Sequence, residues 1–177
     1  VPPKSYYIGL DGYGKNGNGT VEIKEGEFDI VIYECRKMFR LLEQGNPNVL
    51  SMLWTNPRHY ISTTPAGLRL VENRNLFLGR HAYKSFVGYA HGQLHRMTHF
   101  SDEAYVNAYM GAKRKSLVDT LGYDSKNAAH CIRILRMGIE WLVDGTLNVE
   151  RYDNNQLLEI KRGEWSLEAI QKEADRL

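Results

Sequence analysis

The hydrophobic pattern of the chain changes its period once, near residue 34, and this change limits the fold more than any other feature. Before it, β-branched and aromatic residues gather in short runs that predict strands at 6–10, 20–24 and 28–33. After it, apolar residues recur every three or four positions, as on one face of an α-helix. The sequence therefore predicts an α+β fold in which a small β-containing front precedes a mostly helical body.

Capping and turn residues divide the helical part into segments. The apolar stripe that begins at Cys35 ends at Gly45, and Thr64-Pro65, Asp124 and Ser166 each place a side-chain oxygen where a helix can start. We expect further helices at 47–54, 64–77, 80–97, 101–117, 124–143 and from Ser166 to the C-terminus. The stretch between 143 and 166 is given no helix.

Composition places the chain among ordinary globular proteins. It has 177 residues, 42% of them hydrophobic and 25% charged, which is enough for one domain or two small lobes with a common core. A net charge of +2 is too small to indicate nucleic-acid binding by itself. Two cysteines without a Cys-x-x-Cys motif predict a reducing, cytoplasmic environment. No apolar run approaches the roughly 20 residues of a membrane span, so no membrane partner is expected.

Asp29 interrupts the strongest predicted strand, residues 28–33, which is otherwise apolar on both faces. A charge is unfavourable there unless something binds it. In one interpretation Asp29 starts the strand half exposed, or pairs with an arginine. In the other it is a metal-binding carboxylate projecting from a strand, as in phosphoryl-transfer enzymes that hold Mg²⁺ ions with aspartate oxygens. The residue alone leaves both open.

A cationic stripe marks the predicted helix at 124–143. Lys126, His130 and Arg133 follow one another at i, i+4 and i+7 and therefore share a face. Lys161 and Arg162 add a second basic pair before a glycine turn. Such residues suit a triphosphate or a nucleic-acid backbone, because Lys and Arg neutralise phosphate oxygens. The alternative is a solvated basic face. We predict nucleotide or nucleic-acid binding by these five residues.

Five stretches of the chain, in order and at fitting distances, resemble the predicted nucleotidyltransferases of the DNA polymerase β superfamily, in the branch linked with RNA repair. The stretches are VPPKSYYIGL (1–10), DIVIYECRK (29–37), NPNVLSMLW (46–54), KNAAHCIR (126–133) and LLEIKRGE (157–164). Each motif is short, but together they extend along nearly the whole chain. The resemblance implies a partial polymerase β-like α/β core at 1–60 and a helical region at 61–177 packed on it.

The resemblance also implies an activity: transfer of a nucleoside monophosphate from a nucleoside triphosphate to an acceptor hydroxyl, with Mg²⁺ as the cofactor. The acceptor is left open among RNA, DNA, a protein and a small molecule. The family's site contains a Gly-Ser turn, two aspartates on one strand and a third carboxylate on a neighbouring strand. By position Asp29 resembles that third carboxylate, and is expected to be catalytic and metal-binding. The Gly-Ser turn and the paired aspartates are expected before Val1, so the two-metal site is incomplete in residues 1–177.

A second interpretation follows if these residues are the whole protein. Two-metal catalysis that lacks two of its three carboxylates loses most of its transition-state stabilisation. The chain alone would then be inactive. It would be a non-catalytic relative that binds nucleotide, nucleic acid or a partner protein, or a structural component that kept the fold.

Overall fold

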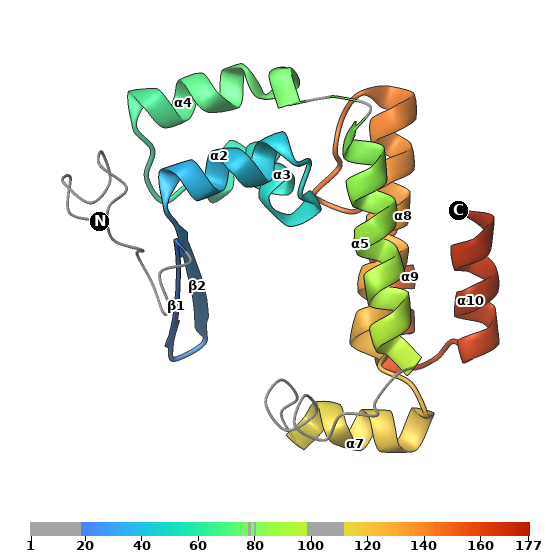
Figure 1. The fold of residues 1–177 in the computed structure, drawn as a ribbon. Helices are drawn as coiled ribbons and strands as arrows, with labels where there is room; N and C mark the ends of the chain where they lie inside the picture. The colour runs from blue at the N-terminus through green and yellow to red at the C-terminus, as the bar shows by residue number, and fades with distance from the viewer. Residues whose placement is uncertain (1–18, 78, 80, 99–111) are drawn as a thin grey trace.

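The computed structural model describes residues 19–77, 79, 81–98 and 112–177 (Figure 1). Within these ranges a two-stranded antiparallel hairpin precedes eight α-helices and two short 3₁₀-helices. The predicted α+β class with a mostly helical body is therefore confirmed. The strand expected at 6–10, the first resembling stretch at 1–10 and the start of the helix expected at 101 lie outside the described residues.

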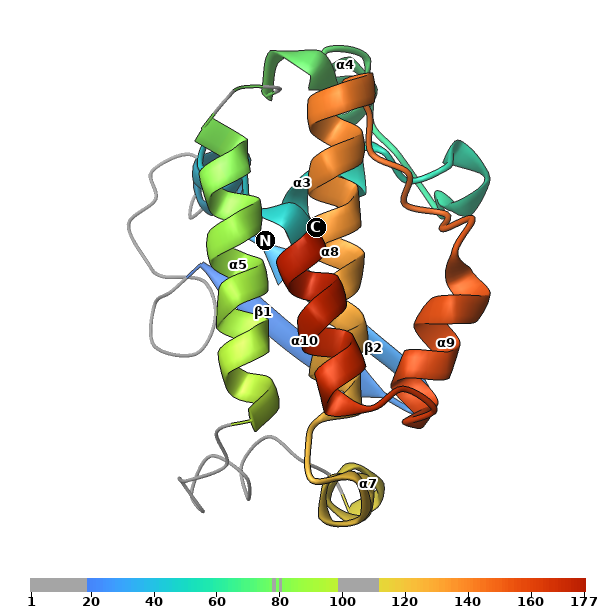
Figure 2. The ribbon, with the colours of Figure 1, turned by 90° about the vertical axis from the view of Figure 1, so that its right-hand side faces the viewer.

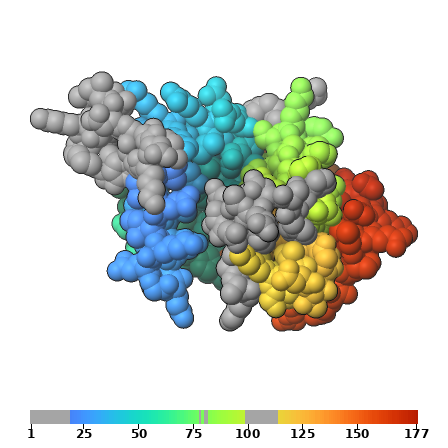
Figure 3. All heavy atoms as spheres, turned by 60° about the horizontal axis from the view of Figure 1, so that its bottom comes forward, coloured from blue at the N-terminus to red at the C-terminus, as the bar shows by residue number. Residues whose placement is uncertain are grey.

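The hairpin consists of β1 (Thr20–Glu25) and β2 (Phe28–Tyr33), which confirms both predicted strands. The register pairs Thr20 with Tyr33 and Lys24 with Asp29. Successive strand residues point to opposite faces. One face is therefore mostly apolar and carries Val21, Ile23, Glu25, Phe28, Ile30 and Ile32, while the other carries Thr20, Glu22, Lys24, Asp29, Val31 and Tyr33. Viewed from below, the hairpin lies on one side of the molecule, and α7 and α10 lie on the other (Figure 3).

Three helices form a layer at one end of the molecule: α2 (Cys35–Glu43), α3 (Pro47–Leu53) and α4 (Pro65–Glu72) (Figure 1). Gly45 joins α2 to α3 in the left-handed region, with φ of 68°. A Cβ atom at Gly45 would lie 2.8 Å from the Cα of Ala82 in α5, so only glycine allows this close approach. Asn46 then caps α3 through its side-chain oxygen.

The helix predicted at 64–77 is only partly regular. Its expected cap is confirmed, since the Thr64 hydroxyl accepts a hydrogen bond from the Gly67 N–H. The α-helix ends at Glu72, and a 3₁₀-helix (Arg74–Phe77) replaces its last turn. Another 3₁₀-helix (Pro57–His59) precedes α4 in the chain.

A bundle of longer helices forms the rest of the molecule. It contains α5 (His81–Thr98), α7 (Ala112–Leu121), α8 (Ser125–Asp144), α9 (Asn154–Arg162) and α10 (Leu167–Arg176). Figure 2 shows α8 beside α5, with α9 and α10 packed along it. The caps expected at Asp124 and Ser166 are confirmed by hydrogen bonds to the first-turn N–H groups of α8 and α10. Helix α9 was not predicted.

Two apolar clusters hold these layers together, and α8 contributes to both. The first joins α2, α3, α5 and α8, where the Trp141 ring packs 5.7 Å from that of Trp54 and 5.6 Å from that of Phe86. The second joins α8 to α9 and α10 through Ile132, Ile160 and other buried residues. Because α8 is buried on two sides, it is a firm support for side chains on its remaining face. No described helix is both long and apolar enough to cross a membrane.

Candidate functional site: a cationic cavity between α8 and α9

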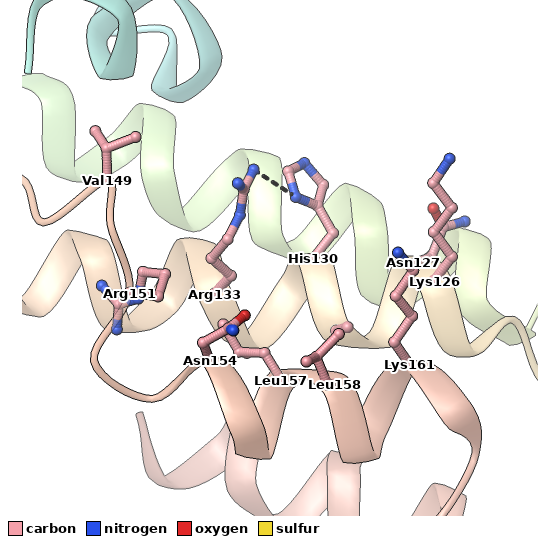
Figure 4. Close-up of a pocket in the computed structure, with 11 residues that line it drawn as sticks. Lys126, Asn127, His130, Arg133, Val149, Arg151, Asn154, Leu157, Leu158 and Lys161 are labelled. Carbon is pink, nitrogen blue, oxygen red and sulfur yellow. Dashed lines mark hydrogen bonds between the residues drawn. The ribbon is translucent and has the colours of Figure 1, made fainter. Parts of the chain in front are cut away.

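A cavity of about 550 Å³ lies between α8, α9 and the loop that joins them (Figure 4). Four of its lining residues are cationic: Lys126, Arg133, Arg151 and Lys161. In the part of the chain that the structure describes, no aspartate or glutamate lines it. This hollow is called the α8–α9 cavity below.

The structure brings together four of the five residues that were predicted to bind nucleotide or nucleic acid. Lys126, His130 and Arg133 lie on one face of α8, as their spacing requires, and Lys161 extends toward them from α9 (Figure 4). The fifth, Arg162, does not line the cavity. Its exposed side chain lies 3.9 Å from that of Glu164.

Arg133 is a partly buried cation without a carboxylate partner among the described residues. Its Nη2 lies 3.0 Å from Nδ1 of His130, and its Nε is buried without a hydrogen-bond partner. Burial lowers the pKa of the guanidinium, and the charge of Arg151 lowers it further. Arginine nevertheless stays protonated at neutral pH. A desolvated charge in this state is unfavourable until an anion joins it.

His130 is neutral at physiological pH. Burial is the main reason that its pKa falls to about 4, and the charges of Arg133, Arg96 and Lys126 lower it further. Because the Arg133 guanidinium can only donate, Nδ1 of His130 is assigned as the acceptor of their hydrogen bond. The ring proton then resides on Nε2. His130 thus offers an uncharged N–H donor beside three cations.

Arg151 was not identified from the sequence, although it lines the same cavity. Its side chain is only 4% exposed. Its Nη1 donates to Glu140 at 2.7 Å and its Nε donates to Asp153 at 2.7 Å, so its charge is compensated. Arg151 lies in an irregular loop, where no hydrophobic period indicates the direction of a side chain. The only sequence signal near Arg151 is Asp153, two residues later. That signal predicts an ion pair and gives no indication that Arg151 lines a binding cavity.

The cavity has more hydrogen-bond donors than acceptors. Three of its lining residues have a buried nitrogen without a partner: Nδ2 of Asn127, Nε of Arg133 and Nη2 of Arg151. These three nitrogens are themselves shielded from the cavity, but the lysine, arginine and histidine side chains of the lining are likewise rich in donors. A ligand rich in acceptor oxygens and negative charge, such as a phosphate chain, has the chemistry that this lining lacks.

Asp29 lies on the exposed hairpin, away from the residues that line the cavity. It shares the face of β2 with Tyr33, whose side chain packs against the first apolar cluster. The pKa of Tyr33 is raised, mainly by burial and then by Glu22 and Tyr89. Tyr33 is thus the residue of β2 that packs against the helical body, whereas Asp29, four residues earlier in the strand, is exposed.

The described residues do not by themselves fit a two-metal site. In that part of the chain, no three histidine, cysteine, aspartate or glutamate side chains lie close enough together to hold a metal ion. Asp29 offers a single carboxylate. The predicted role of Asp29 as a metal ligand therefore stays a prediction.

A comparison with family models agrees with the resemblance seen in the sequence. The model described as RlaP, RNA repair pathway DNA polymerase beta family, matches residues 1–172. Comparisons with curated proteins and with solved structures found no significant match. The family match covers the hairpin, the α8–α9 cavity and most of α10. The chain therefore belongs to the DNA polymerase β family of the RNA repair pathway.

Proposed function

We propose that the protein transfers a nucleoside monophosphate from a nucleoside triphosphate to an acceptor hydroxyl, and that the α8–α9 cavity binds the phosphates of the nucleotide. Family membership supports the class of reaction. The charge of the lining, with four cationic residues and no aspartate or glutamate among the described residues, is the observation that carries the assignment of the phosphate site.

The charges of the cavity suit a triphosphate. Lys126, Arg133 and Lys161 bring three cations that form no ion pair with a described carboxylate. Phosphate oxygens only accept hydrogen bonds, and a guanidinium or an ammonium only donates them. Because the cavity is partly enclosed, these interactions are less screened than on an open surface. The neutral N–H of His130 adds a donor without adding repulsion among the cations.

Asp29 has a separate role in this proposal, as one carboxylate ligand of Mg²⁺. The superfamily uses this ion to stabilise the charge that develops on the transferred phosphoryl group. Asp29 does not line the α8–α9 cavity, so family membership and not its position beside the cavity supports this role. The acceptor is RNA or DNA. Cys35 and Cys131 are both free thiols, which supports a cytoplasmic location.

The proposal separates binding from transfer, and paired measurements on the full-length protein test both. With labelled nucleoside triphosphates, Mg²⁺ and an oligonucleotide bearing a 3′ hydroxyl, the wild type should transfer label. Lys161→Gln should weaken ATP binding and transfer together, by roughly tenfold for one charged contact. Asp29→Asn should abolish transfer and change ATP affinity without Mg²⁺ by less than about threefold.

Lys172→Gln, an exposed substitution on α10, is the charge-matched control and should change neither property. ATP binding by a wild type that never transfers label would identify a binding relative without catalysis. Unchanged ATP affinity in Lys161→Gln would overturn the phosphate site.

A further inference from the structure

A second hollow, of about 410 Å³, lies between α5 and the connection from α2 to α3. It runs along one face of α5, where Lys84, Gly88, Tyr89, Gly92 and Arg96 line it. This hollow is called the α5 groove below. It shares no lining residue with the α8–α9 cavity.

One cationic residue lies near each end of the α5 groove. Lys84 and Arg96 are 12 residues apart on one helix, which corresponds to about 18 Å along its axis. Among the described residues, no aspartate or glutamate lines the groove and neither cation pairs with a carboxylate. Two uncompensated positive charges at this separation match an extended polyanion better than a single compact anion.

The middle of the groove is open down to the helix backbone. A Cβ atom at Gly88 would meet no other atom within 4 Å. At Gly92 its nearest neighbour would be the Nη2 atom of Arg96, at 3.6 Å. Between the two cations, therefore, the surface has room for a ligand.

The α5 groove and the α8–α9 cavity are linked by a contact between one lining residue of each. Tyr89 lines the groove, His130 lines the cavity, and their rings meet edge to face with centroids 5.5 Å apart. The Tyr89 hydroxyl accepts a hydrogen bond of 2.7 Å from Asn48, which fixes the ring. Arg96 is close enough to His130 to lower its pKa. A ligand in the groove is thus separated from the cavity by one pair of rings.

We propose that the α5 groove binds single-stranded nucleic acid and holds the acceptor strand beside the nucleotide. Single strands are bound by grooves in which cations follow the backbone and aromatic side chains contact the bases, as Lys84, Arg96 and Tyr89 are arranged here. The bases of a single strand are free to contact the side chains of the groove, whereas the bases of a duplex are paired and stacked inside it. The acceptor role rests on the proposed function, but the binding of the strand does not.

Filling the groove tests the proposal without removing a charge. Gly88→Leu places a side chain in the open space, and the fold should keep its stability because the helix loses a glycine and gains a good helix former. With a fluorescent single-stranded oligonucleotide, the anisotropy of the full chain should show an affinity lower by roughly tenfold or more, the cost of losing one or more base contacts. Ala169→Leu, on the exposed face of α10, is the matched control and should bind like the wild type.

Charge variants give an independent measurement. In Lys84→Gln the slope of log affinity against log salt concentration should fall by about 0.7, as expected for one phosphate contact with a single strand. Lys172→Gln should leave the slope unchanged. ATP affinity should stay at the wild-type value in both Gly88→Leu and Lys84→Gln, because neither residue lines the α8–α9 cavity.

Three outcomes would overturn the proposal that the α5 groove binds a single strand, and would leave the proposed function standing. They are wild-type oligonucleotide affinity in Gly88→Leu, duplex binding as tight as single-strand binding, and equal binding of a polyglutamate of matched charge. Loss of ATP binding in Gly88→Leu would also count against it, because the groove and the cavity would then not be separate sites.

Discussion

Arg133 shows how a single residue links function to stability. Its guanidinium is partly buried, contacts a neutral histidine and has no carboxylate partner among the described residues. Arg151 lines the same cavity but is held by Glu140 and Asp153. The first arginine is available to a ligand, whereas the second belongs to the framework. The sequence predicted a binding role for Arg133 from helix spacing, but spacing cannot reveal which cations are already neutralised.

Replacing the two arginines should therefore have opposite effects on stability. Arg133→Met removes an unpaired buried charge, so the midpoint of thermal unfolding should stay the same or rise while ATP affinity falls. Arg151→Met leaves the buried carboxylates of Glu140 and Asp153 without this cation and should lower the free energy of unfolding by about 3 kcal/mol. Denaturation followed by circular dichroism measures both. A marked loss of stability in Arg133→Met would show that its charge is compensated in solution.

His130 makes the stability of the protein depend on pH in a defined window. Its folded-state pKa of about 4 lies below the ordinary 6.5, so the unfolded chain binds a proton more readily than the folded one. The contribution of His130 to stability is complete above pH 6.5 and is lost as the pH falls toward 4. Urea unfolding at several pH values should show this decline, and His130→Gln should flatten it.

His91→Gln is the control for this measurement, because His91 is exposed on α5. The free energy of unfolding of this variant should change with pH as it does in the wild type. If the free energy of unfolding of His130→Gln falls with pH as steeply as that of the wild type, groups other than His130 cause the decline.

At the scale of elements, α8 and α9 differ in how far the sequence defines them. Helix α8 has a capping aspartate, a long apolar period and a glycine stop, and its predicted bounds are nearly those observed. Helix α9 begins with two asparagines, which are weak helix formers. The side chain of Asp153 makes no capping hydrogen bond, because it pairs with Arg136 and Arg151 instead. The helix formers from Gln156 to Arg162 and the Gly163 stop were available signals, but without a side-chain cap at its start α9 was missed, and with it the cavity wall that it provides.

The ion pairs around Asp153 should therefore determine how firmly α9 is held. Burial raises the pKa of Asp153, but the hydrogen bonds from Arg151 and Arg136 outweigh it and hold the pKa below its ordinary value. Asp153→Asn leaves two buried arginines short of a carboxylate and should lower the free energy of unfolding by about 3 kcal/mol. Glu164→Gln, in an exposed pair, should change it by less than about 1 kcal/mol. Equal effects in urea denaturation would contradict this role for Asp153.

At the scale of the whole molecule, the order of five motifs was enough to identify the family, and the family match confirms it. The predicted strands at 20–24 and 28–33 and most helices are also confirmed. The shape of the site was beyond the sequence, because the cavity depends on α9 and on an irregular loop. Asp29 was singled out by its apolar neighbours, yet the apolar face of the hairpin is open, with Phe28 74% exposed. Strand alternation shows which residues share a face, and only the structure shows whether that face is covered.

The central claim is that the α8–α9 cavity binds the phosphates of a nucleotide, and a calorimetric series with adenosine, AMP, ADP and ATP tests it most directly. The affinity of the full chain should rise with each added phosphate, be at least about tenfold higher for ATP than for AMP, and fall steeply with salt. The increase from AMP to ATP should largely disappear in a Lys161→Gln, Arg133→Met double variant. Equal affinities for adenosine and ATP, or a double variant that keeps the full increase, would contradict the claim.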